Sequence, residues 1–93
     1  MHCVLRQYLG ASELFDLLVS READVREVIG SVPGLVSYAL VRVGDGGFSV
    51  TVCQDKAGTD ESMRRARDWV ATNAPGLSGG TPPVSEGDVI TSL

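Results

Sequence analysis

The side chains that could do chemistry in this 93-residue chain are mainly aromatic or cationic. Six candidates for a ligand cavity combine aromatic rings, guanidinium groups and one hydroxyl: Arg6, Tyr8, Tyr38, Arg42, Thr51 and Trp69. An aromatic ring with a polar tip can hold a planar ligand, and a guanidinium can neutralise an anionic one. These residue types predict a binding surface for a small aromatic molecule. They do not identify a catalytic residue.

Each candidate also has a purely structural interpretation. Trp69 could be a core or rim aromatic, Tyr38 a contact between subunits, and Arg42 an exposed side chain near a turn. His2 is the only histidine and could act as a base near neutral pH, although a residue so near the start of the chain is usually mobile. Both interpretations stay open.

The sequence lacks the motifs of several common catalytic and binding sites. The chain has no Ser/His/Asp arrangement, no paired-carboxylate motif and no phosphate loop. Gly44-Asp45-Gly46-Gly47 joins two expected strands, and no helix follows it to receive a phosphate. Cys3 and Cys53 form no CxxC pair and have no histidine near them in the sequence, which argues against zinc. We therefore expect no metal and no cofactor.

Length and charge limit the class of protein. Ninety-three residues are enough for a single domain, 1–93, with one core. The formal charge of −4 argues against a nucleic-acid partner. No apolar run approaches the roughly 20 residues that a membrane helix needs, and the first residues lack the pattern of a signal peptide. We expect a cytoplasmic protein with no membrane partner.

The hydrophobic pattern predicts the elements that must position these residues. Strands are expected over 2–9, 35–43, 47–54 and 84–93 and helices over 12–19, 22–31 and 59–73, with a loop over 76–83. Ser12 and Thr59 are the expected helix N-caps, and Arg21 interrupts the apolar stripe between the first two helical segments. This order predicts an α+β, ferredoxin-like βαββαβ fold. Its four-stranded antiparallel sheet would run 4-1-3-2, with the helices on one face.

The two faces of the central hairpin differ in composition. A turn at Asp45-Gly46 would pair Val43 with Phe48. That register separates a wholly apolar set, expected to face the helices, from a mixed set: Val36, Tyr38, Leu40, Arg42, Ser49, Thr51 and Cys53. The mixed face suits packing on a second sheet with a cavity between the two sheets. A one-residue slip would exchange the faces.

The first strand has the same ambiguity. Cys3, Leu5 and Leu9 have the character of helix-facing residues. Because side chains alternate along a strand, His2, Arg6 and Tyr8 would then point toward the cavity.

At this point the chain resembles a known group. Val32-Pro33-Gly34 enters a strand that carries Tyr38, Asp55-Lys56-Ala57-Gly58 follows the hairpin, and Arg67-Asp68-Trp69-Val70 lies on the last helix. These features resemble small proteins of the dimeric α/β-barrel superfamily that are antibiotic-biosynthesis-monooxygenase-like. The resemblance implies a homodimer with a ligand cavity between sheet and helices.

The resemblance also implies a choice of activities. Some relatives oxygenate polyphenolic substrates without metal or flavin, because the bound substrate anion reacts with oxygen. Others degrade haem with a helical histidine as the iron ligand, and here the one histidine is His2. Two hypotheses follow: a cofactor-independent monooxygenase of an aromatic, enolisable substrate, or a non-catalytic dimeric module that binds a small molecule or supports assembly.

Overall fold

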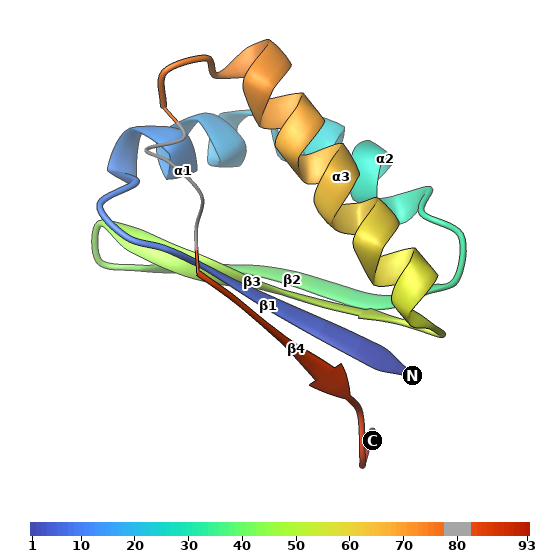
Figure 1. The fold of residues 1–93 in the computed structure, drawn as a ribbon. Helices are drawn as coiled ribbons and strands as arrows, with labels where there is room; N and C mark the ends of the chain where they lie inside the picture. Colours follow the sequence, from blue (N-terminus) through green and yellow to red (C-terminus); the bar gives the residue numbers. More distant parts are fainter. Residues whose placement is uncertain (78–82) are drawn as a thin grey trace.

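The computed structural model describes residues 1–77 and 83–93. In this part of the chain four strands form one antiparallel sheet in the order β2-β3-β1-β4. The strands are β1 (His2–Tyr8), β2 (Leu35–Val43), β3 (Gly46–Cys53) and β4 (Val84–Asp88). Helices α1 (Ser12–Ser20), α2 (Glu22–Gly30) and α3 (Lys56–Asn73) lie on one face of it (Figure 1). The predicted α+β ferredoxin-like fold and strand order are confirmed.

The first helical region is broken where the sequence predicted. Arg21 separates α1 from α2, and its backbone N–H donates to the Leu17 carbonyl at 2.9 Å. Ser12 is not the N-cap of α1. That position is Ala11, whose side chain makes no capping bond and whose N–H donates to the Asp45 carbonyl at 2.8 Å. The start of α1 is therefore tied to the tip of the β2–β3 hairpin.

Helix α3 begins three residues before the expected position. Asp55 is its N-cap and accepts a hydrogen bond from the Gly58 N–H at 3.0 Å. Thr59, the expected cap, is fully buried within the helix. Aspartate is among the best N-cap residues, so the helix starts at the first residue that can satisfy its free N–H groups.

The hairpin turn differs from the prediction by one residue. Val43 pairs with Gly46, which leaves Gly44 and Asp45 in the turn. Gly44 has a φ of +59°, and no non-glycine residue in the described part of the chain has a positive φ. The pairing is shifted by two residues from the expected register, so the same side chains still share a face.

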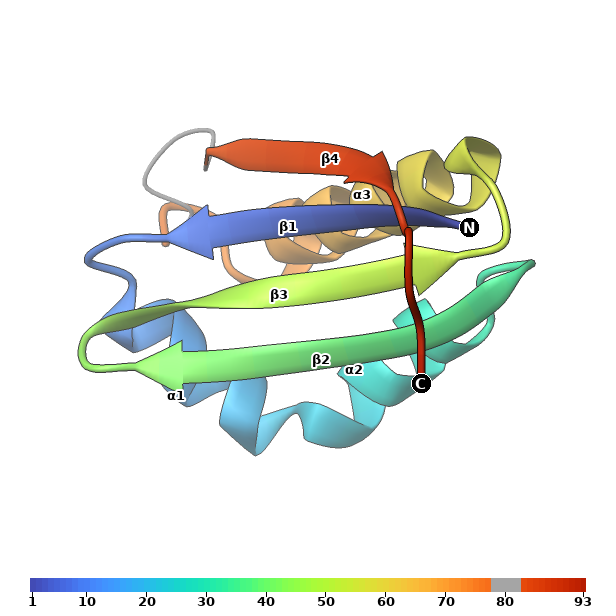
Figure 2. The ribbon, with the colours of Figure 1, turned by 90° about the horizontal axis from the view of Figure 1, so that it is seen from below.

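The assignment of the two sheet faces was wrong. The mixed set, including Tyr38, Leu40 and Arg42, faces the helices. The apolar side chains face the other way and form what we call the outer face: Cys3, Leu5, Ala39, Val41, Val43, Phe48, Val50 and Val52. No helix among residues 1–77 and 83–93 covers this face (Figure 2). The predicted cavity between two sheets is therefore replaced by one between sheet and helices.

Close packing of α3 explains this choice of face. Gly58 lies so near β3 that an added Cβ would be 2.7 Å from the Cβ of Cys53. Ser49 and Thr51 are buried on the same side of β3, and no buried side-chain N or O atom of the described residues lacks a hydrogen-bond partner. Small polar residues thus admit the helix where bulky valines would hold it away.

The first strand follows the same exchange. His2, Arg6 and Tyr8 share the face of Tyr38, as predicted, but this is the helix-facing side, so Cys3 and Leu5 point outward. His2 is buried, with 9% of its surface exposed, and its Nδ1 lies 2.8 Å from Thr59 Oγ1.

The last strand is shorter than predicted. β4 ends at Asp88, and the Val89 N–H donates to the Met1 carbonyl at 2.9 Å. Most of the expected 76–83 loop, residues 78–82, lies outside the described residues. Among the described helices, none combines the length and apolar character needed to cross a membrane.

Candidate functional site

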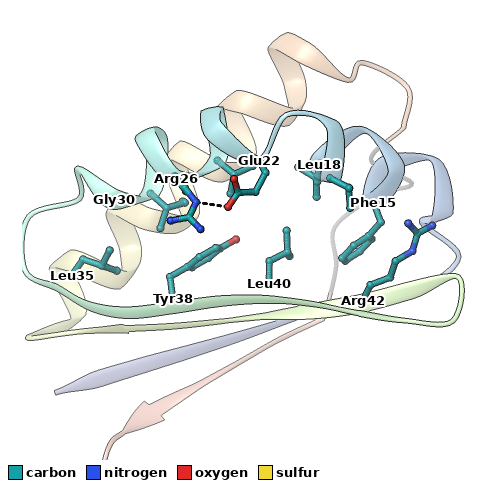
Figure 3. A pocket seen from close by; sticks show the side chains of 12 residues that line it. Phe15, Leu18, Glu22, Arg26, Gly30, Leu35, Tyr38, Leu40 and Arg42 are labelled. Atoms are coloured by element: carbon teal, nitrogen blue, oxygen red, sulfur yellow. Dashed lines mark hydrogen bonds and ion pairs between the residues drawn. The ribbon is translucent and has the colours of Figure 1, made fainter.

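A groove of about 530 Å³ separates α1 and α2 from strand β2 (Figure 3). Residues from α1 and α2 form one wall, and Leu35, Tyr38, Leu40 and Arg42 of β2 form the floor. The lining is largely apolar, with these members from the helices: Phe15, Leu18, Val19, Val25, Ile29 and Gly30. The alternation of β2 produces this floor, because Tyr38, Leu40 and Arg42 are two residues apart.

Two ion pairs lie along the groove. Arg26 and Glu22, one turn apart on α2, form an ion pair above Tyr38, with Gly30 and Leu35 beyond it (Figure 3). At the opposite end of the groove, Arg42 Nη2 lies 2.8 Å from Asp16 Oδ1 on α1. A ligand between the two pairs would therefore meet two guanidinium groups, each already paired with a carboxylate.

Tyr38 is the polar group of the floor. Its hydroxyl points toward the helices, and none of the other residues drawn in the groove forms a hydrogen bond with it (Figure 3). Burial, with a smaller contribution from Tyr8, raises the pKa of Tyr38 to about 12, although Arg6 acts in the opposite direction. Tyr38 is thus neutral at physiological pH and can donate a hydrogen bond.

Two smaller cavities lie on the inner side of Tyr38. One, of about 40 Å³, is bounded by Tyr8, Tyr38 and Trp69 with apolar residues of all three helices. The other, of about 10 Å³, is bounded by Arg6, Tyr38, Thr51 and five neighbours. Tyr38 and Ile29 both line the groove and the two cavities, so these two side chains lie between them.

Trp69 is contacted by Arg21 and Asn73. The Arg21 guanidinium lies over the indole, 5.7 Å from the ring centroid, which is within cation–π range. Asn73 Nδ2 donates to the Trp69 carbonyl at 3.0 Å, and Arg21 Nη2 donates to Asn73 Oδ1 at 3.5 Å. The guanidinium thus contacts the indole that lines the inner cavity, and Asn73 links the same guanidinium to the Trp69 backbone.

The second aromatic wall is built around Tyr8. Its ring meets Phe15 edge-on, with centroids 5.7 Å apart, and the Arg6 guanidinium lies 5.5 Å from the Tyr8 centroid. Arg6 and Tyr8 therefore belong to the interior between sheet and helices, not to an outward-facing surface.

The six sequence candidates thus surround one region, although they do not all line one cavity. Arg42 lies in the outer groove, Tyr8 and Trp69 line the larger inner cavity, and Arg6 and Thr51 line the smaller one. Sequence reasoning missed the helix wall of the groove, notably Phe15, Glu22 and Arg26. The Glu22–Arg26 spacing was visible in the sequence, but it is equally typical of an ordinary surface helix.

The structure offers no histidine to this region. His2, the only one in the chain, has Thr59 on Nδ1 and Glu86 at 3.4 Å from Nε2. It therefore does not fit the role of a haem ligand in the groove. No group of three or more His, Cys, Asp or Glu side chains in residues 1–77 and 83–93 is arranged to hold a metal ion.

No protein-family model and no curated protein sequence matches the chain. Several solved structures are similar to it. A haem-degrader, MhuD from Mycobacterium tuberculosis with two haems bound, has a TM-score of 0.68 at 14% identity, covering 100% of this chain and 99% of that one. An antibiotic biosynthesis monooxygenase has a TM-score of 0.66 at 16% identity, covering 98% and 100%.

A third solved structure has a named activity without a cofactor. It is a variant of SnoaB, a cofactor-independent oxygenase from Streptomyces nogalater, with a TM-score of 0.60 at 14% identity, covering 99% of this chain and 95% of that one. These identities carry information on fold alone. The chain has the fold of these antibiotic biosynthesis monooxygenase-like structures, as its sequence motifs predicted.

Proposed function

We propose that this chain is a homodimer that binds a planar aromatic molecule in the groove and oxygenates it without a cofactor. The observation that carries the proposal is the Tyr38 hydroxyl, which points into an apolar groove and keeps its proton at neutral pH. The groove volume of about 530 Å³ falls within the range of about 300–1,000 Å³ typical of small-molecule sites.

The lining residues suit an enolisable aromatic ligand. Leu18, Leu40 and Ile29 would cover its faces and exclude water. Tyr38 would donate a hydrogen bond to the oxygen that carries negative charge after enolisation, and such charge-assisted bonds are stronger than neutral ones. Arg42, at one end of the groove beside Asp16, would place a guanidinium on the same strand as Tyr38.

The chemistry needs no external reductant. An anthrone and one molecule of oxygen give an anthraquinone and one molecule of water, because the substrate carbanion supplies the electrons and its CH₂ group becomes the second carbonyl. The protein would hold the enolate and stabilise its charge. The family resemblance and the named activity of SnoaB support this choice of reaction.

A non-catalytic ligand-binding module is the second candidate. Glu22 is the carboxylate that lines the groove, and it is paired with Arg26. Tyr38 retains its proton at neutral pH. Neither group is poised to remove a proton from the ligand, and this observation favours binding without turnover.

The homodimer is proposed from the outer face. Its side chains on β1, β2 and β3 are apolar along the middle of each strand, with Gln7 and Ser37 toward the ends. An apolar sheet face is normally covered. All the described helices of this chain lie on the other face of the sheet. A two-fold dimer brings the same patch of both copies together, and no like charges would then oppose each other on this uncharged face, so a second copy is the occupant we propose. A cytoplasmic location stays a prediction.

Oxygen uptake with anthrone tests the proposal, with binding followed by thermal shift. Leu40→Trp, which fills the groove, is the matched control, and its circular dichroism must match that of the wild type. Uptake by the wild type above the Leu40→Trp rate supports the oxygenase. Binding without uptake favours the module. If anthrone shifts the melting temperature of both proteins equally and neither consumes oxygen above background, the groove is not the site.

A further inference from the structure

Ile29, in the last turn of α2, lies where the spaces between helices and sheet meet. It lines the groove, the larger inner cavity and the smaller one, and Tyr38 is the other residue that all three share. Leu18, Val25 and Leu40 border the groove and the larger cavity alone. Only 4% of Ile29 is exposed. Its side chain is therefore an apolar barrier between the groove and both inner cavities.

The backbone around Ile29 is anchored at the end of α2. Arg65 Nη1 on α3 donates to the Val28 carbonyl at 3.3 Å and to Ser31 Oγ at 2.7 Å. The Val32 N–H donates to the Ile29 carbonyl at 3.0 Å. An isoleucine in a helix has one strongly preferred χ1 rotamer, because its Cβ is branched. These contacts and this preference favour a fixed barrier over one that swings aside for a ligand.

The larger inner cavity suits an alkyl group better than an aromatic ring. Its volume is about 40 Å³, well below the roughly 150 Å³ of an engineered cavity in another protein that binds benzene. Beyond Ile29 its lining is apolar and aromatic and includes Leu14, Val70 and Trp69. An alkyl substituent of a ligand in the groove would gain burial there if Ile29 did not stand between the two spaces.

We propose that Ile29 is a specificity-determining residue, whose side chain confines an aromatic ligand to the groove and excludes its ring substituents from the inner cavities. The proposal rests on the proposed function, because it takes the groove as the ligand site. Truncation of residue 29 to alanine would join the groove to both cavities. A ligand could then place an alkyl group beside Trp69 while its ring system stays at Tyr38.

Binding of anthraquinone and of its ethyl derivative to Ile29→Ala tests this role. Quenching of the fluorescence of Trp69, the only tryptophan, gives both dissociation constants. Wild type should bind the two compounds within about twofold of each other, because the ethyl group gains no burial. Ile29→Ala should bind the ethyl derivative about tenfold more tightly than anthraquinone, since each buried carbon group strengthens binding about fourfold.

Two further variants control for packing and for folding. Val28→Ala, at the neighbouring residue of α2, enlarges the larger inner cavity without joining it to the groove, because Val28 lines that cavity and not the groove. Its preference between the two compounds should equal that of wild type. Ile29→Val loses one methyl group and is less destabilising than Ile29→Ala. It should favour methylanthraquinone over anthraquinone about two- to fourfold, and circular dichroism must show that each variant is folded.

The outcomes separate the role of Ile29 from that of the groove. A wild type that binds neither compound overturns the proposed function and the role of Ile29 together. A wild type that binds anthraquinone, with folded Ile29 variants that keep its preference, overturns the role of Ile29 and leaves the groove. The same holds if wild type already prefers the ethyl derivative as strongly as Ile29→Ala does, or if Val28→Ala does so, because the barrier would then not be Ile29.

Discussion

Tyr38 is the residue that joins the separate parts of the candidate site. It lines the groove and the two inner cavities, and its hydroxyl points toward the helices from the floor of β2. A ligand in the groove would therefore meet a single neutral donor surrounded by apolar side chains. The contribution of that donor can be measured separately from the packing of the ring.

We predict that Tyr38→Phe weakens binding of an anthraquinone about three- to tenfold, because one hydrogen bond contributes about 0.5–1.5 kcal/mol. Fluorescence of Trp69, the only tryptophan, measures the affinity. Thermal stability should stay within about 0.5 kcal/mol, since none of the groove residues bonds to the hydroxyl. Thr72→Val, on the exposed side of α3, is the control for loss of a hydroxyl. Equal affinities for Tyr38→Phe and wild type would show that the ligand does not contact Tyr38.

The pKa of Tyr38 gives a second prediction. Its folded-state value of about 12 lies above the ordinary value of 10.0, so the folded protein holds this proton more tightly than the unfolded chain does. The associated stability is complete below about pH 10 and is lost as the pH rises toward 12.

Absorbance titration of the Tyr8→Phe variant, which keeps Tyr38 as its only tyrosine, checks this value. Ionisation should occur well above pH 10, although below the wild-type value because the smaller contribution of Tyr8 is lost, and denaturant midpoints should fall as the pH rises above 10. Adding Tyr38→Phe should remove that part of the pH dependence. Ionisation of Tyr38 near pH 10 in the folded variant would contradict its burial.

The position of helix α3 determines the size of the smaller inner cavity. It touches β3 at Gly58, and its buried Ser62 donates to the Thr59 carbonyl at 2.7 Å. The side chains of α3 that face the sheet, Met63 and Ala66 among them, bound the smaller inner cavity. The separation between α3 and the sheet therefore sets the space around Arg6 and Thr51.

Gly58→Ala should push helix α3 away from β3 and destabilise the protein by about 1–3 kcal/mol. The added methyl would lie 2.7 Å from the Cys53 Cβ and 3.2 Å from the Pro33 carbonyl oxygen. The steric cost of these contacts outweighs the higher helix propensity of alanine.

Gly30→Ala, at the end of α2, is the matched control. Nothing lies within 4 Å of its added Cβ, so it should be neutral or stabilising by up to about 1 kcal/mol. Urea denaturation of both variants gives the comparison. Equal stability of the two would show that α3 does not sit as close to β3 as described.

At the scale of the whole molecule, the sheet separates two environments. The helices cover a face with polar and aromatic side chains, whereas the opposite face is apolar and open (Figure 2). This arrangement suits a protein whose ligand lies inside each subunit and whose subunits meet through their sheets.

A charge on the outer face should therefore prevent association. Val50→Lys should weaken the proposed dimer at least about 100-fold, because an unpaired charge buried between sheets costs about 3–5 kcal/mol. The monomer should keep its circular dichroism, since residue 50 lies on the uncovered face.

Ala71→Lys, on the exposed side of α3, is the control for added charge. Sedimentation velocity distinguishes the species. A Val50→Lys protein as dimeric as Ala71→Lys would show that copies of the chain do not meet through the outer face.

The sequence alone determined the elements and the groups of residues that share a face. The break at Arg21, the glycine-rich turn and the strand order follow from local patterns. Strand alternation put Tyr38 and Arg42 on one side of β2, and Thr51 of β3 shares that side because the actual register differs from the expected one by two residues, an even number. Alternation is a property of the backbone, so it can be derived without knowledge of distant contacts.

Only the tertiary structure decided which side of the sheet the helices cover. A strand pattern distinguishes two faces but does not say which neighbour each one meets, and the more apolar face is not necessarily the one nearest the chain's own helices. Here the contact of Gly58 with Cys53 lets α3 approach a face of small polar residues. The groove depends on that contact and on the packing of α1 and α2 over β2, which join residues far apart in the sequence.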